Sequence, residues 1–180
     1  MMPLRDTDNW QIKTAVRRRT AAVLGTVCAY RPFANAVCWR RRCRKVAVTF
    51  DDGPNSEFTP EVLSILASFR VKATFFVLGN AVENNSYVLQ TIIADGHDIG
   101  IHGYDHSGTK LREQVLRCEQ ILNRFGQSTR LFRPPRGEIG PVLLAWLIRH
   151  GFTTVLWSFD VRDSMRAEKR WSGPDPDFEQ

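Results

Sequence analysis

Two adjacent carboxylates and, about fifty residues later, two histidines are the side chains in this sequence best suited to chemistry. Asp51 and Asp52 directly follow the apolar run 46–50, and the later pair is His102 and His106. Successive side chains of a strand point to opposite faces, so the two aspartates can serve different roles. One carboxylate and two imidazoles make a ligand set for a hydrolytic zinc ion. The second carboxylate then remains available to face a substrate.

Short apolar segments rich in β-branched residues alternate with helical periodicity from residue 45 onward. Such alternation predicts parallel strands connected by helices. The polar residues of interest fall just after predicted strands, where parallel α/β folds build their sites. Strands are predicted at 45–51, 73–78, 98–102, 130–133 and 153–160, and helices at about 58–69, 85–95, 110–125 and 140–150.

The composition is that of one globular domain, with 180 residues, 43% hydrophobic and 24% charged. The net charge of +6 comes from the first 45 residues, where 11 Lys and Arg face 2 Asp and Glu; the remainder has 14 against 17. We therefore divide the chain into a basic, irregular leader at 1–44 and a domain at 45–180. The leader either contacts an anionic surface or is simply solvated. It carries no recognisable reader motif, so we expect no nucleic-acid partner.

The leader also bears on location. Residues 17–36 place arginines, an apolar stretch and small residues in the order of an export signal, although Arg31 and Pro32 interrupt it. Export and a cytoplasmic location both stay open. No apolar run reaches the roughly 18 residues of a spanning helix, so no transmembrane segment is expected. The four cysteines, three of them in the leader, do not decide the compartment.

Three motifs occur in order, each closing a predicted strand: TFDDGP at 49–54, HGYDH at 102–106 and RPPRG at 133–137. With them the chain resembles the NodB-homology polysaccharide deacetylases, the fourth carbohydrate esterase family, over roughly residues 45–163. The resemblance implies a distorted, incomplete (β/α) barrel of parallel strands. It also implies metal-dependent removal of acetyl groups from an N- or O-acetylated carbohydrate such as chitin or peptidoglycan oligomers. The metal in this family is usually zinc.

The resemblance implies a role for each motif residue. Asp51 would be the general base, because water must lose a proton as it attacks an amide. Asp52, His102 and His106 would bind the metal. Arg133 would pair with Asp51, orienting it and lowering its pKa. A single histidine at a strand end is more often structural, and a single arginine more often forms a surface ion pair, so these roles depend on the motifs occurring together.

Other positions follow the family less closely. Arg136 stands where the family usually has tyrosine; its backbone N–H would share the charge of the oxyanion. Asp160 resembles the family aspartate that orients a catalytic histidine. Ser164 stands where a tryptophan usually lines the sugar groove, so Trp157 or Trp171 becomes the candidate aromatic platform.

The family's general-acid histidine has no counterpart here. His97 opens the strand that carries His102, and His150 ends a helix, so both are expected on the far side of the sheet. After Asp163 the sequence shows only a polar tail, and we expect a barrel that lacks its last strand or strands and a domain that is C-terminally incomplete. The strand at 153–160 would then be an exposed edge, which favours self-association.

Two functional classes remain from the sequence. The first is an active metal-dependent deacetylase, and the second is a catalytically impaired zinc- or carbohydrate-binding member that lacks the acid. A surface-associating protein working through its basic leader is a third. Short connections between the predicted elements favour an open groove, which suits an extended glycan.

Overall fold

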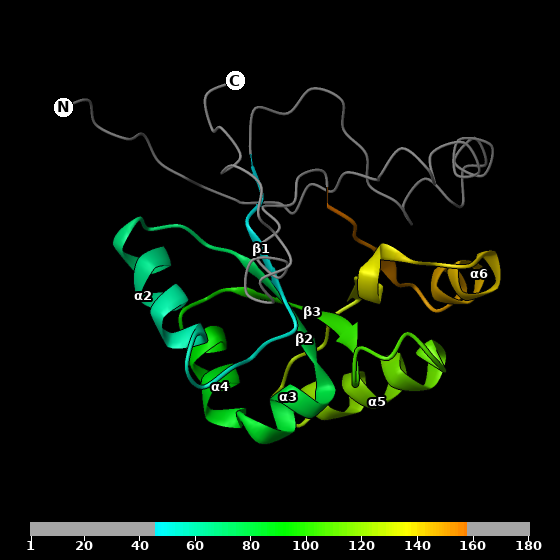
Figure 1. The fold of residues 1–180 in the computed structure, drawn as a ribbon, viewed down its shortest axis with the longest axis horizontal. Helices are drawn as coiled ribbons and strands as arrows, with labels where there is room; N and C mark the ends of the chain where they lie inside the picture. Colours follow the sequence, from blue (N-terminus) through cyan, green and yellow to red (C-terminus); the bar gives the residue numbers. More distant parts are fainter. Residues whose placement is uncertain (1–45, 158–180) are drawn as a thin grey trace, which may run out of the picture.

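The computed structural model describes residues 46–157, in which five parallel strands form one sheet in the order β1-β2-β3-β4-β5 (Figure 1). Each strand pairs in parallel with the next along the chain, as the alternation of apolar segments and helical periodicity predicted. The α/β class is therefore confirmed. In the described part of the chain, β1 and β5 stand at the two ends of this order. The strands are β1 (Thr49–Asp51), β2 (Thr74–Leu78), β3 (Asp98–Gly103), β4 (Leu131–Phe132) and β5 (Thr153–Thr154).

Helices fill the connections between strands. Four of them coincide with predicted helices, and α3 was not predicted. It has six residues and follows β2 directly, too short to show a helical period. The first residue of α3 is Gly79. A Cβ there would lie 2.7 Å from the Tyr104 ring, so a glycine leaves room for that ring. The helices are α2 (Thr59–Ser68), α3 (Gly79–Asn84), α4 (Ser86–Ala94), α5 (Leu111–Asn123), the 3₁₀ turn η2 (Pro135–Gly137) and α6 (Pro141–Arg149).

The last predicted strand is shorter than expected. Residues 153–160 were predicted as one strand, but β5 covers only Thr153–Thr154, and 155–157 are irregular. The Val155 N–H still bonds to the Phe132 carbonyl at 2.8 Å, so the chain keeps close to β4 there. Residues 158–160 and the leader at 1–44 lie outside the described residues.

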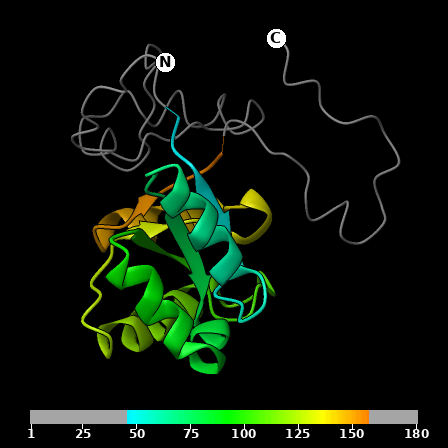
Figure 2. The same ribbon diagram turned by 90° about the vertical axis from the view of Figure 1, so that its left-hand side faces the viewer.

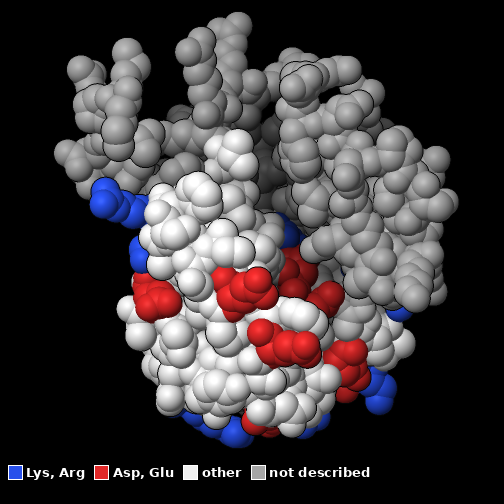
Figure 3. Space-filling model, turned by 60° about the vertical axis from the view of Figure 1, so that its left-hand side comes forward, with Lys and Arg blue, Asp and Glu red and all other residues white. Residues whose placement is uncertain are grey.

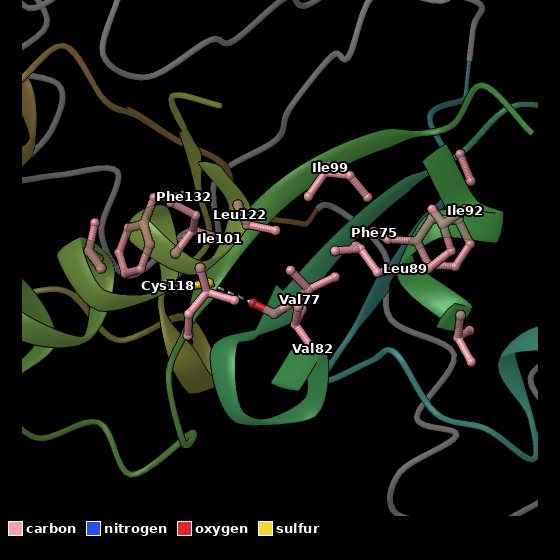
Figure 4. Packing of buried hydrophobic residues seen from close by; sticks show 14 of the residues in the cluster. Phe75, Val77, Val82, Leu89, Ile92, Ile99, Ile101, Cys118, Leu122 and Phe132 are labelled. Atoms are coloured by element: carbon pink, nitrogen blue, oxygen red, sulfur yellow. Dashed lines mark hydrogen bonds between the residues drawn. The ribbon is translucent and has the colours of Figure 1, made fainter. Parts of the chain in front are cut away.

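One face of the sheet packs against helices and forms the core. Figures 1 and 2 show α2, α4, α3 and α5 wrapped around the same side of the strands. Alternate residues of β2 and β3 point to that side, and all are 5% exposed or less (Figure 4). The labelled core side chains are Phe75, Val77, Ile99 and Ile101 from these strands, Val82, Leu89, Ile92, Cys118 and Leu122 from the helices, and Phe132 from β4.

The opposite face of the strands carries the polar residues. Phe76 of β2 is fully buried on this face and is paired with Gly100 of β3. A Cβ at Gly100 would lie 2.4 Å from the Phe76 ring, so this position must be glycine for the ring to fit. His102 follows two residues later on the same face, and Asp51 of β1 lies beside Phe76 in the register. Strand alternation therefore separates the apolar core from the chemical groups.

The described part of the chain is nearly balanced in charge, unlike the leader. On the face shown in Figure 3, acidic side chains gather near the centre and basic ones lie toward the margins. Among the described residues, no helix is long and apolar enough to cross a membrane.

Candidate active site

Three side chains converge at the C-terminal edge of the sheet. Asp52 Oδ1 lies 3.5 Å from His102 Nε2 and 3.6 Å from His106 Nε2, and the three ligand atoms all lie within 4.8 Å of one another. Ligand atoms about 2.0–2.1 Å from a tetrahedral ion lie about 3.3–3.4 Å apart, which is close to the two shorter separations. The arrangement therefore fits a divalent metal, and the mixed oxygen and imidazole donors suit zinc.

His102 is held in the tautomer that a metal ligand needs. Its ring is 2% exposed, and Nδ1 lies 2.8 Å from the backbone carbonyl of Arg133. A carbonyl can only accept, so Nδ1 carries the proton and the Nε2 lone pair faces Asp52. Burial lowers the pKa of His102, while the nearby Asp51 and Asp52 carboxylates act in the opposite direction. The ring therefore favours the neutral form that binds a cation.

Asp52 and His106 both have left-handed backbone conformations, with φ of 69° and 60°. Such conformations are unfavourable for residues with a Cβ and persist where the surroundings impose them. Next to Asp52, the Gly53 carbonyl accepts a hydrogen bond from the Leu78 N–H at 3.0 Å. This bond ties the turn after β1 to β2. Asp52 remains 59% exposed and His106 34% exposed, so the cluster opens to solvent on the side away from His102.

Asp51 forms an ion pair with Arg133 below this cluster. Arg133 Nη1 donates to Asp51 Oδ1 at 2.7 Å and to Thr49 Oγ1 at 2.8 Å, and Nε donates to the Val155 carbonyl at 3.3 Å. The guanidinium is 3% exposed and lies over the Phe76 ring, 4.1 Å from its centroid. Since β1, β4 and the segment after β5 all contribute, the sheet fixes the orientation of Asp51.

Burial determines the direction of the Asp51 pKa, although Arg133 lowers this pKa as predicted. Burial raises the pKa of this carboxyl, and this effect outweighs the opposing charges of Arg133 and His102. The physical reason is that the surrounding strands remove water from the carboxylate, which penalises its charged form. In the metal-free chain, burial therefore makes Asp51 a stronger base.

Arg136 and Trp157 lie near the Arg133 segment. Arg136 is exposed and has a φ of 57° in the turn η2, three residues beyond Arg133. The Trp157 ring lies 5.7 Å from the Arg133 guanidinium and packs so closely on Gly137 that a Cβ there would be 2.9 Å from it. The structure thus brings the indole to the same edge of the sheet. Asp160, Ser164 and Trp171 lie outside the described residues.

The other two of the chain's four histidines lie away from this edge. His97 precedes β3, at the end of the strand opposite to His102, and its Nδ1 accepts a hydrogen bond from the Ala73 N–H at 3.1 Å. His150 caps the end of α6, where its ring stacks on Trp146 at 4.2 Å. Neither was expected at the site, and the structure agrees.

Two residues around the site were not predicted. Thr49 shares Arg133 with Asp51, and its position two residues before Asp51 on a strand was the available signal. Gln114 bonds to the loop that carries His106 and is 8% exposed. A polar residue among the apolar positions of α5, next to Val115, could have marked it.

Comparison with known proteins places this site in a family. The polysaccharide deacetylase family matches residues 40–155. A peptidoglycan-N-acetylglucosamine deacetylase of Bacillus cereus is 42% identical over 126 residues, covering 66% of this chain and 46% of that protein. A chitooligosaccharide deacetylase of Sinorhizobium fredii is 35% identical over 137 residues, covering 72% of this chain and 60% of that protein.

A solved structure agrees with the sequence comparison. The crystal structure of a peptidoglycan N-acetylglucosamine deacetylase in complex with an N-oxidanyl-benzamide compound superposes with a TM-score of 0.64 at 42% identity, covering 66% of this chain and 59% of that one. The chain thus spans about half to three fifths of the length of these relatives. On its motifs, its fold and these matches, the chain belongs to the polysaccharide deacetylase family.

Proposed function

We propose that this protein is a zinc-dependent deacetylase of N-acetylated glycans such as peptidoglycan or chitin oligomers. The observation that carries the proposal is the position of Asp51, held by Arg133, next to the Asp52–His102–His106 cluster. Relatives named for peptidoglycan and chitooligosaccharide deacetylation support the substrate class.

The proposed mechanism divides the work between two adjacent aspartates. Asp52, His102 and His106 would hold the ion, which when bound polarises an acetyl carbonyl and favours ionisation of water. Asp51 takes the proton from the attacking water, and a cation held beside it would keep its carboxylate ionised and available. Arg133 keeps the Asp51 carboxylate in one orientation and leaves its other oxygen available.

The remaining contacts would serve the substrate. The backbone N–H of Arg136 is proposed to share the charge that develops on the carbonyl oxygen. Trp157 is proposed to stack on a sugar ring, since its half-buried indole is fixed against Gly137. Asp160 is proposed to orient a side chain that donates a proton, as its counterpart in the family orients a histidine.

Acetate release from N-acetylglucosamine oligomers tests this proposal directly. We expect Asp51→Asn to reduce the rate by about 10²–10⁴-fold, the usual contribution of a general base, while zinc remains bound. Asp52→Asn should lose both zinc and activity. Asp98→Asn, an exposed aspartate at the opposite end of β3, is the matched control and should change neither. Equal rates in Asp51→Asn and Asp98→Asn would contradict the assignment of the base.

A catalytically impaired, zinc-binding protein is the second candidate. The observation in its favour is that all four histidines are placed, and none besides His102 and His106 lies at the site. An amine leaves poorly unless it is protonated, so a missing acid slows the reaction. Stoichiometric zinc binding without acetate release would favour this candidate over the first.

We also propose that the chain self-associates. The strand β5 ends the described strand order, at the edge that the sequence predicted to be exposed. Ile65 of α2 and the flanking Phe58 and Phe69 add exposed apolar side chains, at 52%, 60% and 73% exposure. Exposed apolar groups of this kind are typical of protein contacts. We expect the molar mass of the chain in light scattering to rise with protein concentration. In Ile65→Glu, the mass should fall to that of the monomer. Leu116→Glu on α5 is the control, and an unchanged monomer mass in the parent chain would overturn the proposal.

An extracytoplasmic location is proposed from the chemistry of the substrate. Wall and matrix glycans lie outside the cytoplasm, and residues 17–36, outside the described residues, have the order of an export signal. Cell fractionation would test this, since recovery only in the cytoplasm contradicts it.

A further inference from the structure

The Gln114 side chain makes four hydrogen bonds to the loop between β3 and α5. Its Oε1 accepts from the backbone N–H groups of Tyr104 and Asp105 at 2.7 and 3.2 Å. Its Nε2 donates to Ser107 Oγ at 2.8 Å and to the Thr109 carbonyl at 2.7 Å. One neutral amide thus uses both acceptor positions and both donors on residues on either side of His106.

The loop has little other regular support. Gly103, His106 and Lys110 all have positive φ, so the segment forms neither strand nor helix. Backbone support comes from the Asn80 N–H, which bonds to the Tyr104 carbonyl at 3.0 Å at the start of the loop. Gln114 is 8% exposed, so its hydrogen bonds are largely shielded from water and restrict the backbone. Within the loop itself, Asp105 Oδ1 accepts from the Ser107 N–H at 2.9 Å and Ser107 Oγ accepts from the Thr109 N–H at 3.3 Å. Among the described residues, Gln114 is the side chain from outside the loop that bonds to the backbone of residues 104–109.

The two histidines of the cluster differ in how they are held. His102 belongs to β3 and its ring is bonded to the Arg133 carbonyl. Within residues 46–157, the His106 ring contacts Asp52 and the His102 ring, and no hydrogen bond to Nδ1 orients it. Its position therefore comes from its backbone, and that backbone is held by Gln114.

We propose that Gln114 is a positioning residue that sets the affinity of the metal site through His106. This inference rests on the proposed metal-binding function and deepens it. Hydrogen-bond partners that orient metal ligands typically contribute about 10–100-fold in affinity. Because the amide is neutral, its effect operates through loop geometry and not through charge.

The test is zinc affinity of the full 180-residue chain, measured by competition with a chelating dye. Gln114→Met keeps the side-chain length and removes all four bonds, and we expect its Kd to rise about 10–100-fold. Gln120→Met, an exposed glutamine on the same helix, is the matched control and should stay within about twofold of the parent. A Gln114→Met Kd within that same range overturns the inference.

A double-mutant cycle separates positioning from general destabilisation. In a His106→Ala background the remaining ligands still bind zinc weakly, and Gln114→Met should cause no further loss if it acts through His106. An equal loss in both backgrounds would show that Gln114 supports only the fold and would overturn the inference.

Hydrogen exchange in the metal-free parent chain gives a readout that needs neither metal nor variant. The Tyr104 and Asp105 amides should exchange slowly, because Gln114 occupies both; exchange at the rate of an open loop overturns the inference. If the parent chain bound no zinc, the proposed function would fail while these amides would still report on the loop. The two failures are therefore distinguishable.

Discussion

Strand β3 has a buried histidine at each end, and the two rings offer opposite nitrogens. His97 at the N-terminal end accepts a hydrogen bond at Nδ1 from the Ala73 N–H, so its Nε2 carries the proton when the ring is neutral. His102 at the C-terminal end donates from Nδ1 to the Arg133 carbonyl, so its Nε2 has a free lone pair.

Burial does not distinguish these two histidines. They are 9% and 2% exposed, and burial lowers the pKa of both. What differs is the backbone group that each meets, a donor for His97 and an acceptor for His102. The same residue type therefore becomes a structural acceptor at one end of the strand and a candidate metal ligand at the other.

The largest expected difference between the two ends is in zinc affinity. His102→Ala removes one of three ligands, and we expect the Kd to rise by more than the roughly 100-fold that loss of an orienting partner can cause. His97→Ala should leave the Kd within about twofold, because its ring lies at the other end of the sheet. Isothermal titration of the metal-free chain measures both, and a similar loss in the two variants would break the comparison.

His97 should matter for the stability of the fold, although it should not matter for zinc affinity. His97→Ala leaves the Ala73 N–H buried without this acceptor and removes an edge-to-face contact with Phe75, whose ring centroid is 5.4 Å away. We expect the free energy of unfolding to fall by about 1–3 kcal/mol. Urea denaturation of the metal-free chain provides the measurement. No loss of stability would mean that the Ala73 bond contributes nothing.

A smaller effect is expected from the titration of His97. Burial and Lys72 lower its pKa below 6.5 in the folded chain, against the opposing charges of Asp95 and Asp98. The unfolded chain then binds more protons, so the stability that His97 contributes is complete above pH 6.5 and is lost as the pH falls toward the folded pKa. Parent and His97→Gln unfolding curves should therefore converge or cross on acidification. A constant difference between pH 8 and pH 5 would contradict this.

The smallest expected difference is in the tautomers of the two rings, and it can be measured without any substitution. Nitrogen-15 NMR of the metal-free chain at pH 8 should find the proton on Nε2 of His97 and on Nδ1 of His102. Identical tautomers at both positions would remove the distinction that separates the two ends.

Much of the fold could be predicted because its signals are local. Apolar segments predicted the positions of the five strands, and helical periodicity predicted α2, α4, α5 and α6. The helix α3 was missed because six residues contain too few turns to show a period, and the strand predicted at 153–160 was too long because an apolar run does not show where pairing ends.

The members of the candidate site were predicted, together with the Arg133–Asp51 pair, but its other supporting contacts were not. Asp51, Asp52, His102 and His106 follow strands, and the ends of parallel strands meet at one edge. The role of Gln114 depends on a side chain of α5 reaching back to the preceding loop, and no local spacing of residues reports that. The lowering of the Asp51 pKa by Arg133 was predicted, but the larger opposing effect of burial was not, since burial depends on the strands around the carboxyl.

By itself, the sequence indicated which groups could bind a metal and that two adjacent carboxylates could serve different roles, because residue type and strand alternation are properties of the chain. Its resemblance to the family implied that Asp51 is the base. Only the tertiary structure decided which nitrogen of each histidine carries the proton, how Arg133 reaches Thr49, Asp51 and Val155 together, and how Gln114 holds the His106 loop. These contacts join residues from different strands and helices, and hydrogen bonds act only over about 3 Å, so they exist only once the sheet has assembled.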